Sequence, residues 1–171
     1  MNRKTAQQKN GKLTGYTYLV NISDINKIWN NFEKRVKYEI RKCQQWVRVS
    51  DDFDKFDYFH KLSRPDRVID RKFIVKTYRE KQPTCRMYAT DTAMAMISWN
   101  KKRGYYLLAG RDKLIKPDGS PSKILWQAMS DLHDMGIKEF DMCGANKKNI
   151  KLFKKGFGGK LVKQKKYCLS Y

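Results

Sequence analysis

Residues Ser120 to Gly159 read SPSKILWQAMSDLHDMGIKEFDMCGANKKNIKLFKKGFGG, and this stretch decides the fold. Apolar residues recur at helical spacing over residues 122–135, between a Ser-Pro-Ser start and Gly136, which predicts a helix with a glycine stop. Residues 137–143 alternate between apolar and polar side chains and predict a short strand. Residues 146–156 are dense in lysine and predict a second helix. The domain is therefore expected to continue as helix, strand and helix.

The rest of the chain predicts a mixed α/β domain that contains a three-stranded antiparallel meander. Ser23 and Asp24 are expected to cap one helix whose apolar face extends to Ile40. The segment from Asp66 to Glu80 fits either a helix or a strand. Because a helical crossover joins the strands on either side of the 122–135 helix, we expect those strands to pair in parallel. The other expected elements are strands at residues 16–22, 46–49, 85–89, 92–99, 104–110 and 160–169, and helices at 25–40, 52–62 and 66–80.

Three motifs carry a resemblance to a known family. Trp126 lies near the start of the long helix, Gly136–Gly144 reads GIKEFDMCG, and Phe153–Gly158 reads FKKGFG. A supporting block, Phe32–Cys43, reads FEKRVKYEIRKC. Together they resemble the FemAB-like aminoacyltransferases, which build peptidoglycan cross-bridges and are relatives of the GNAT acyltransferases. The resemblance runs from about Tyr16 to the end of the chain. Family members usually carry two such domains, and this chain resembles the C-terminal one.

The resemblance implies both a fold and an activity. The implied fold is a GNAT-like α/β domain with a central mixed, mostly antiparallel sheet flanked by helices. The implied activity moves an aminoacyl group from an activated ester, aminoacyl-tRNA, to an amine acceptor such as a cell-wall precursor. Because the aminoacyl-tRNA is itself a substrate, no separate cofactor is implied.

Within this resemblance, Lys154 and Phe153 are the candidate catalytic residues. The family implies that the lysine stabilises the tetrahedral intermediate and that its aromatic neighbour helps to hold the site together. A cation beside a developing oxyanion acts mainly on the transition state, so the chemistry fits. We expect Leu152 and Phe153 on the buried side of their helix. The alternative interpretation makes Lys154 one of many solvated lysines and Phe153 a core residue.

Charge is the second strong feature of the chain. Lys and Arg number 38 against 17 Asp and Glu over 171 residues, a formal net charge of +21, and the nine lysines after Asp141 are accompanied by no acidic residue. Such a field favours tRNA or another polyanion and allows peripheral contact with an anionic membrane. Cations at a helix C-terminus can instead simply complement the helix dipole. The candidate substrate- and phosphate-binding residues are Arg35, Arg41, Lys42, Lys147, Lys148 and Lys151.

Other features limit the class of protein. The four cysteines form no C-x-x-C pair, so we expect no metal site, and Cys143 is expected to pack rather than to react. His60 and His133 neighbour no plausible nucleophile. The chain shows no apolar secretion signal and no run of about 20 apolar residues, which predicts a cytoplasmic protein without a transmembrane segment. Residues 1–15 are expected to form a flexible polar lead, and residues 16–171 a single domain.

Two other functions stay open. An acetyl-coenzyme A dependent N-acetyltransferase would carry a pyrophosphate loop, Q/R-x-x-G-x-G/A, before the long helix, and Gly110–Ser122 does not match it. The amides of Gly119 and Ser120 could still bind an anion at the helix start. A non-catalytic GNAT-like domain that binds RNA would also suit the excess charge. A cleft around Lys154 would favour the enzyme over such a binding domain.

Overall fold

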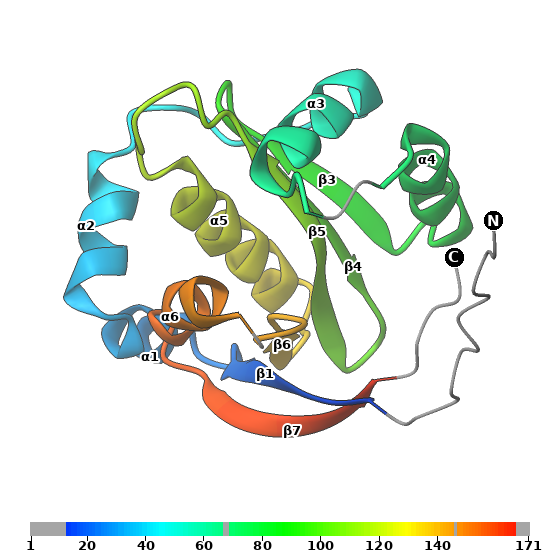
Figure 1. Ribbon diagram of the computed structural model, residues 1–171. Coiled ribbons are helices and arrows are strands. Elements are labelled where there is room, and N and C mark those ends of the chain that lie inside the picture. The colour runs from blue at the N-terminus through cyan, green and yellow to red at the C-terminus, as the bar shows by residue number, and fades with distance from the viewer. Residues whose placement is uncertain (1–12, 67–68, 146, 167–171) are drawn as a thin grey trace, which may run out of the picture.

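The computed structural model describes residues 13–66, 69–145 and 147–166 (Figure 1). Their strands form a seven-stranded sheet in the order β2-β3-β4-β5-β6-β1-β7. Neighbouring strands pair antiparallel except β5 and β6, which pair in parallel as predicted. The sheet is therefore mixed and mostly antiparallel, as expected of a GNAT-like domain. The strands are β1 (Leu13–Asn21), β2 (Arg48–Val49), β3 (Cys85–Ala89), β4 (Ala93–Trp99), β5 (Arg103–Arg111), β6 (Glu139–Asp141) and β7 (Lys160–Lys166).

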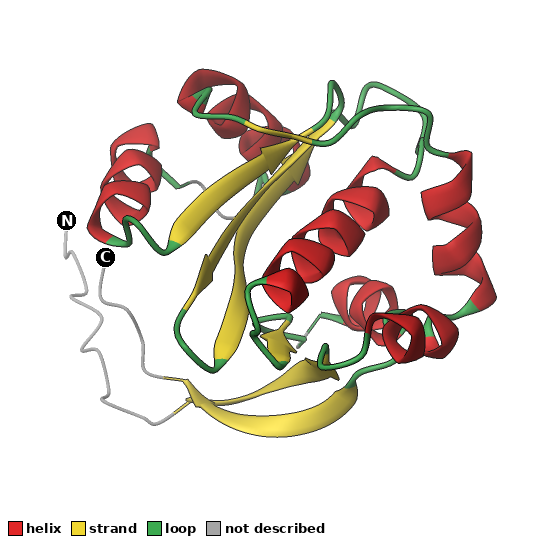
Figure 2. Cartoon of the chain, turned by 180° about the vertical axis from the view of Figure 1, so that it is seen from behind, coloured by secondary structure: helices red, strands yellow, loops and turns green. Residues whose placement is uncertain are grey.

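Helices cover both faces of this sheet (Figure 2). Side chains of a strand alternate between the two faces, and β4 shows the result clearly. Ala93, Ala95 and Ile97 join the core beneath α5, whereas Met94 and Met96 join a second core beneath α3 and α4. The helices are α1 (Ile25–Asn31), α2 (Lys34–Lys42), α3 (Phe53–Ser63), α4 (Arg71–Glu80), α5 (Ser120–Asp134) and α6 (Lys148–Lys155).

The long helix α5 makes the crossover from β5 to β6. Pro121 lies in its first turn, and Gly136 follows its end with a φ of +80°, a left-handed conformation that favours glycine. The helix begins at Ser120, two residues before the predicted start. The strand after it, Glu139–Asp141, is shorter than the predicted 137–143.

The predicted single helix over residues 25–40 is wrong, because the helix is interrupted between α1 and α2. Phe32 is extended (ψ 138°) and buries its ring 5.5 Å from Trp126 and 5.2 Å from Phe157. The next backbone N–H, that of Glu33, donates to the carbonyl of Gly156. Aromatic packing against α5 and the end of α6 therefore outweighs the helical periodicity.

Smaller differences concern single segments. The ambiguous 66–80 segment is a helix over Arg71–Glu80, with residues 67–68 outside the described residues. Leu152 is 61% exposed, so its predicted burial is wrong, whereas Phe153 packs against the core as predicted. β1 begins at Leu13, inside the predicted polar lead. Residues 1–12, Asn146, Cys168 and the end of the predicted 160–169 strand lie outside the described residues.

Candidate functional site

A cavity forms where β5 and β6 separate. The two strands pair only between Arg103–Tyr105 and Glu139–Asp141, after which β6 ends while β5 continues to Arg111. The space between them is a cavity of about 530 Å³. Its wall comes from the end of α3, from β4 and β5, from the start of α5, and from the loop and helix that follow β6. The residues that matter chemically in this wall are His60, Ser63, Arg64, Tyr106, Arg111, Lys113, Cys143, Lys147, Phe153 and Lys154.

Lys154 lies in the wall of this cavity and is only 5% exposed. Its ammonium donates hydrogen bonds to three successive backbone carbonyls, those of Met142, Cys143 (2.5 Å) and Gly144 (2.8 Å). An ammonium has three protons to donate, so one carbonyl is available for each. It also lies 5.1 Å from the centre of the Tyr106 ring. Lys154 is therefore a buried, well-coordinated cation rather than a solvated surface lysine.

The backbone of the loop after β6 turns its carbonyls toward the Lys154 ammonium. Cys143 and Gly144 both adopt left-handed backbone conformations, with φ of 47° and 74°. A cysteine in this region is uncommon and costs conformational energy, which the surrounding contacts must offset. The Cys143 N–H donates to the buried carboxylate of Asp141, which also accepts from the hydroxyl of Thr17. The Lys154 ammonium and the Asp141 carboxylate thus hold the loop from two sides.

The thiol of Cys143 borders the cavity but is poorly suited to nucleophilic attack. Burial, with a further contribution from the negative charge of Asp141, raises its pKa to about 12. Because the thiolate is the reactive form, this group stays protonated near neutral pH. The packing role expected from the sequence fits this environment better than a catalytic one.

Phe153 also lines the cavity and packs edge-on against Phe157, with ring centroids 5.4 Å apart. The histidines have structural contacts. His60 is buried at the cavity wall with Nδ1 3.0 Å from the carbonyl of Ala109, and His133 places Nδ1 2.7 Å from the carbonyl of Ile22. Of the two, only His60 borders the cavity, a position that the sequence did not predict.

The three candidate cations of α2 lie outside the cavity lining. Arg35 forms a 2.8 Å ion pair with Glu39 one turn later, and the Arg41 guanidinium lies 5.3 Å from the centre of the Trp29 ring. Lys42 is exposed in the last turn of the helix. Arg41 and Lys42 lie in the last turn of α2, where the dipole interpretation places cations, whereas Arg35 lies in the first turn. The predicted phosphate-binding role of the three residues stays a prediction.

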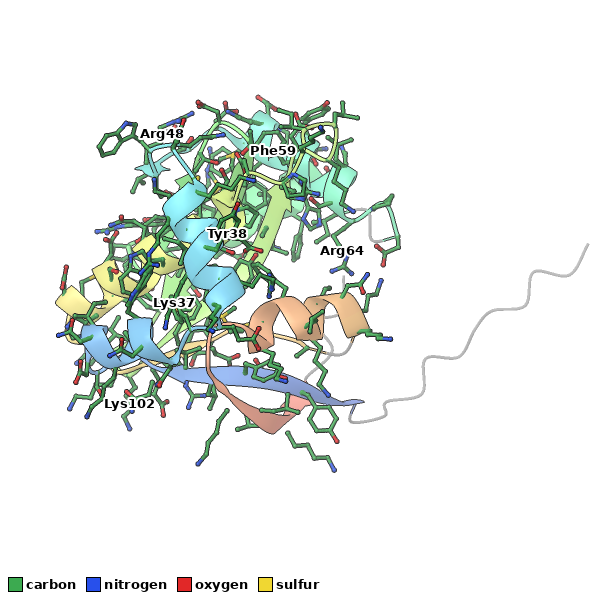
Figure 3. All side chains as sticks on the ribbon, turned by 90° about the vertical axis from the view of Figure 1, so that its left-hand side faces the viewer. Lys37, Tyr38, Arg48, Phe59, Arg64 and Lys102 are labelled. Carbon is green, nitrogen blue, oxygen red and sulfur yellow. The ribbon has the colours of Figure 1, made fainter. Side chains whose placement is uncertain are left out.

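Of the three candidate lysines near α6, one lies in the cavity wall. Lys147 lines the cavity, while Lys148 and Lys151 are exposed on the helix. Lys147 forms an ion pair with Asp66, which Arg64 also contacts at 3.2 Å. Figure 3 shows Arg64 in the space between α3 and α6. One exposed carboxylate therefore joins the two sides of the cavity mouth.

Three cavity cations were missed by the sequence interpretation: Arg64, Arg111 and Lys113. They come from the end of α3, the end of β5 and the following loop, so no spacing in the sequence connects them. With Lys147 and Lys154 they make five cations, and none of the described residues that line the cavity is an Asp or Glu. The cavity is therefore a strongly positive environment with an apolar floor.

The N-terminus of α5, in contrast to the cation-lined cavity, holds a carboxylate. The Asp118 carboxylate accepts hydrogen bonds from the side chains of Gln45 (2.6 Å) and Thr92 (2.7 Å), and from the N–H (2.9 Å) and hydroxyl (2.8 Å) of Ser120. Burial would raise the pKa of Asp118, but these bonds hold it below its ordinary value. Gly119, rather than a serine of the Ser-Pro-Ser start, is the N-cap. Its Cα faces the Glu39 carbonyl so closely that a Cβ would lie 2.1 Å from that oxygen.

Metal and membrane features can be assessed over the same part of the chain. Within residues 13–66, 69–145 and 147–166, no cluster of three His, Cys, Asp or Glu side chains is arranged to hold a metal ion. None of the helices described there has the length and apolarity needed to cross a bilayer.

Solved structures show which proteins share this fold. FemX matches with a TM-score of 0.79 at 11% identity, over 90% of this chain and 63% of its own. The C-terminal domain of a protein assigned as a lysylphosphatidylglycerol synthetase of Agrobacterium fabrum matches at 0.61 and 14% identity, over 87% and 58%. A GCN5-related glucosamine N-acetyltransferase region of a fungal multi-domain beta-N-acetylglucosaminidase matches at 0.55 and 9% identity, over 90% and 20%.

These likenesses confirm the expected fold. The resemblance to FemX and to a GCN5-related acetyltransferase region bears out the GNAT-like, FemAB-like prediction at the level of structure. The chain spans less than two thirds of the length of each of these structures. No protein-family model and no curated protein sequence matches this chain.

Proposed function

We propose that this protein is an acyltransferase that moves an aminoacyl group from the ester of an aminoacyl-tRNA to an amine, such as that of a cell-wall precursor. The observation that carries the proposal is the buried ammonium of Lys154 in the wall of a cavity between two separating strands. A cleft, rather than a convex surface, is the setting in which a cation acts strongly on a transition state, because little water screens it there.

The charge of the cavity supports a polyanionic donor. Arg64, Arg111, Lys113 and Lys147 border the cavity together with Lys154. An aminoacyl-tRNA brings phosphodiesters within a few ångströms of its reactive ester. Cations around the mouth would bind those phosphates and hold the ester near the floor, and positioning of this kind supplies a large part of catalysis in a bimolecular reaction.

The start of α5 supports a donor other than acetyl-coenzyme A. A helix N-terminus binds phosphate through free N–H groups and its positive dipole end. Here the first-turn N–H of Ser120 already donates to Asp118, and Gly119 packs against the backbone of α2. A pyrophosphate at this position would meet a carboxylate and have no room beside the glycine.

The proposed reaction needs one nucleophile and one stabilised oxyanion. The acceptor amine attacks the ester carbonyl carbon, forming a C–N bond while the carbonyl oxygen takes the electron pair. The Lys154 ammonium stabilises that oxyanion by exchanging one of its three hydrogen bonds to backbone carbonyls for a hydrogen bond to the oxyanion. Collapse re-forms the C=O bond and breaks the C–O bond to the ribose, whose oxygen takes up a proton that the amine has lost.

The test compares two donors on the intact protein. Bulk tRNA charged with radiolabelled amino acids is incubated with the protein and an amine-bearing peptide, and the label that survives mild alkali is measured. Alkali cleaves the ester but leaves the new amide intact. A parallel reaction contains labelled acetyl-coenzyme A and the same peptide. We expect alkali-stable label from charged tRNA alone.

Two results would overturn the proposal, and they differ in what they indicate. Label transferred from acetyl-coenzyme A but not from tRNA would identify an acetyltransferase. Tight binding of charged tRNA without any loss of its ester would identify the non-catalytic RNA-binding domain considered from the sequence.

A further inference from the structure

Two loops at one end of the sheet expose large apolar side chains. Trp46, in the loop between α2 and β2, is 87% exposed, and Leu114, in the loop between β5 and α5, is 78% exposed. Val49 and Ile115 beside them are also exposed. These four residues are called the loop surface below. Exposed apolar residues are normally scattered singly, so the adjacent, exposed Leu114 and Ile115 and the largely exposed Trp46 are candidates for contact with a partner or a membrane.

Hydrogen bonds hold the two loops together. The Gln45 side chain donates to Asp118 (2.6 Å) and accepts from the N–H of Asp91 (2.7 Å), while the N–H of Asp112 donates to the Thr92 carbonyl (2.8 Å). Both loops are thus fastened to the turn between β3 and β4. Figure 1 shows the cyan chain after α2 beside the yellow-green loop that leads into α5. The apolar side chains therefore belong to one end of the molecule.

Positive charges accompany these apolar residues. Leu114 and Ile115 lie between Lys113 and Lys116 in the sequence KLIK, and both lysines are exposed. Two acidic side chains in or near these loops already have partners. Asp91 pairs with Arg48 at 2.9 Å, and Asp112 accepts the N–H of Leu114 at 2.8 Å.

We propose that the loop surface docks this protein on an anionic lipid bilayer. Aliphatic side chains such as Leu114 and Ile115 enter the acyl region, tryptophan favours the interface between headgroup and hydrocarbon, and flanking lysines bind anionic headgroups. A nucleic acid fits less well, because three of the four side chains of the loop surface are aliphatic and offer no ring on which a base could stack. A second copy fits less well too, because two chains of charge +21 would bring lysines against lysines.

This surface adjoins the cavity. Arg111, the last residue of β5, and Lys113, in the loop that follows, are among the residues that line it. Docking through Leu114 and Ile115 would therefore hold the cavity close to the headgroups. The docking surface does not depend on which reaction takes place in the cavity, so it can be tested by itself.

The test measures partition of the intact protein onto vesicles by co-sedimentation. One set of vesicles is pure phosphatidylcholine, and the other contains phosphatidylglycerol in addition. We expect binding to the anionic set alone. The double variant Leu114→Ser, Ile115→Ser should weaken it at least about tenfold, since two apolar side chains no longer leave water. Lys116→Gln should weaken it by about fivefold, the contribution of one lysine near such a surface.

A matched control and a spectroscopic measurement separate insertion from simple charge attraction. Leu152→Ser removes another exposed leucine, on α6, and should leave the partition unchanged. Trp46 is the one tryptophan of four that is largely exposed, so vesicles should shift tryptophan emission to the blue, and Trp46→Phe should abolish the shift.

Three results would overturn the proposal. The first is an absence of binding to anionic vesicles. The second is equal binding by wild type and by the Leu114→Ser, Ile115→Ser variant, which would assign the attraction to net charge alone. The third is self-association of the wild type that this variant abolishes, measured by light scattering without vesicles, which would make a second copy the occupant.

Discussion

Asp118 and Lys154 are two charged groups held by hydrogen bonds beside a helix end, but Asp118 lies in a closed space and Lys154 borders an open cavity. Asp118 sits at the start of α5, where side chains and a packed glycine close the space around it. Lys154 sits in the last turn of α6, held by backbone carbonyls in the wall of an open cavity. Each charge suits the dipole of its helix. The difference teaches that an acid closes the start of α5, where a helix N-terminus would otherwise favour an anion, while positive charge is concentrated in the cavity.

The largest expected effect comes from removing the cation. Lys154→Ala should slow the single-turnover transfer rate at saturating aminoacyl-tRNA by roughly a hundredfold or more, the scale of losing one oxyanion donor. It should also lower the free energy of unfolding by about 1–3 kcal/mol, because three carbonyls of the loop after β6 lose their partner. Rapid-quench kinetics and urea unfolding measure the two effects separately.

Lys155→Ala is the matched control, since this neighbouring lysine is exposed on another face of α6. It should be nearly silent in both measurements. Equal transfer rates for the two variants would make Lys154 a structural residue of the loop and leave the reaction without an identified catalytic group.

Much of the fold could be predicted from the sequence because its signals are local. Helical periodicity, the glycine after α5 and the alternation in the strands are properties of short segments, and Lys154 lies inside one recognisable motif. Phe32 shows the limit. Nothing next to it in the sequence indicates a break, because the break results from packing against Trp126 and Phe157, about 100 residues away along the chain.

The site could be predicted only in part for the same reason. Arg64, Arg111 and Lys113 lie in unrelated segments and meet at the cavity through the tertiary fold. Asp118 reads as an ordinary loop residue, and its role depends on Gln45, which is 73 residues away. Excess charge predicts a polyanion site, but charge alone cannot say where on the fold it lies.

The next largest effect concerns the lysines on and before α6 and their contribution to tRNA binding. Charge reversal on and before α6 should weaken tRNA binding by about tenfold or more at low salt, and should lower the slope of log affinity against log salt, because fewer counterions are released. Filter binding across a salt series measures both quantities. The variant combines Lys147→Glu, Lys148→Glu and Lys151→Glu.

The control carries the same change in net charge on α4 and at its C-cap, which do not line the cavity. Its binding should fall by a smaller factor and its salt slope should stay close to that of the wild type. Identical losses in the two triple variants would mean that the whole surface, rather than the cavity region, attracts tRNA. The control combines Lys72→Glu, Lys76→Glu and Lys81→Glu.

A smaller effect should follow from freeing the cavity mouth. Asp66 lies between Lys147 and Arg64, whose hydrogen bonds hold its pKa well below its ordinary value, so it is ionised at neutral pH. Asp66→Asn should strengthen tRNA binding by roughly two- to fivefold, since both cations become available for phosphate. Asp54→Asn, which breaks the exposed pair with Arg71, should not strengthen it. A gain in both variants would point to the loss of any acid, and no gain in either would make the Asp66 bridge irrelevant to binding.

The smallest effect concerns Asp118 and appears in stability rather than in rate. Its pKa is lowered on folding, so its carboxylate contributes stability above the ordinary value of 3.8, and that contribution disappears as the pH falls through the lowered folded-state pKa. Asp118→Asn should therefore lower the free energy of unfolding by about 1 kcal/mol at pH 7, because an amide cannot accept all four hydrogen bonds. The gap to wild type should shrink as the pH drops below 3.8.

Asp134→Asn, at the exposed far end of α5, should change stability by less than about 0.5 kcal/mol at either pH. Urea unfolding of the three proteins at pH 7 and in the acid range measures this, and a gap that stays constant with pH would mean that the asparagine disturbs packing instead of removing a charge.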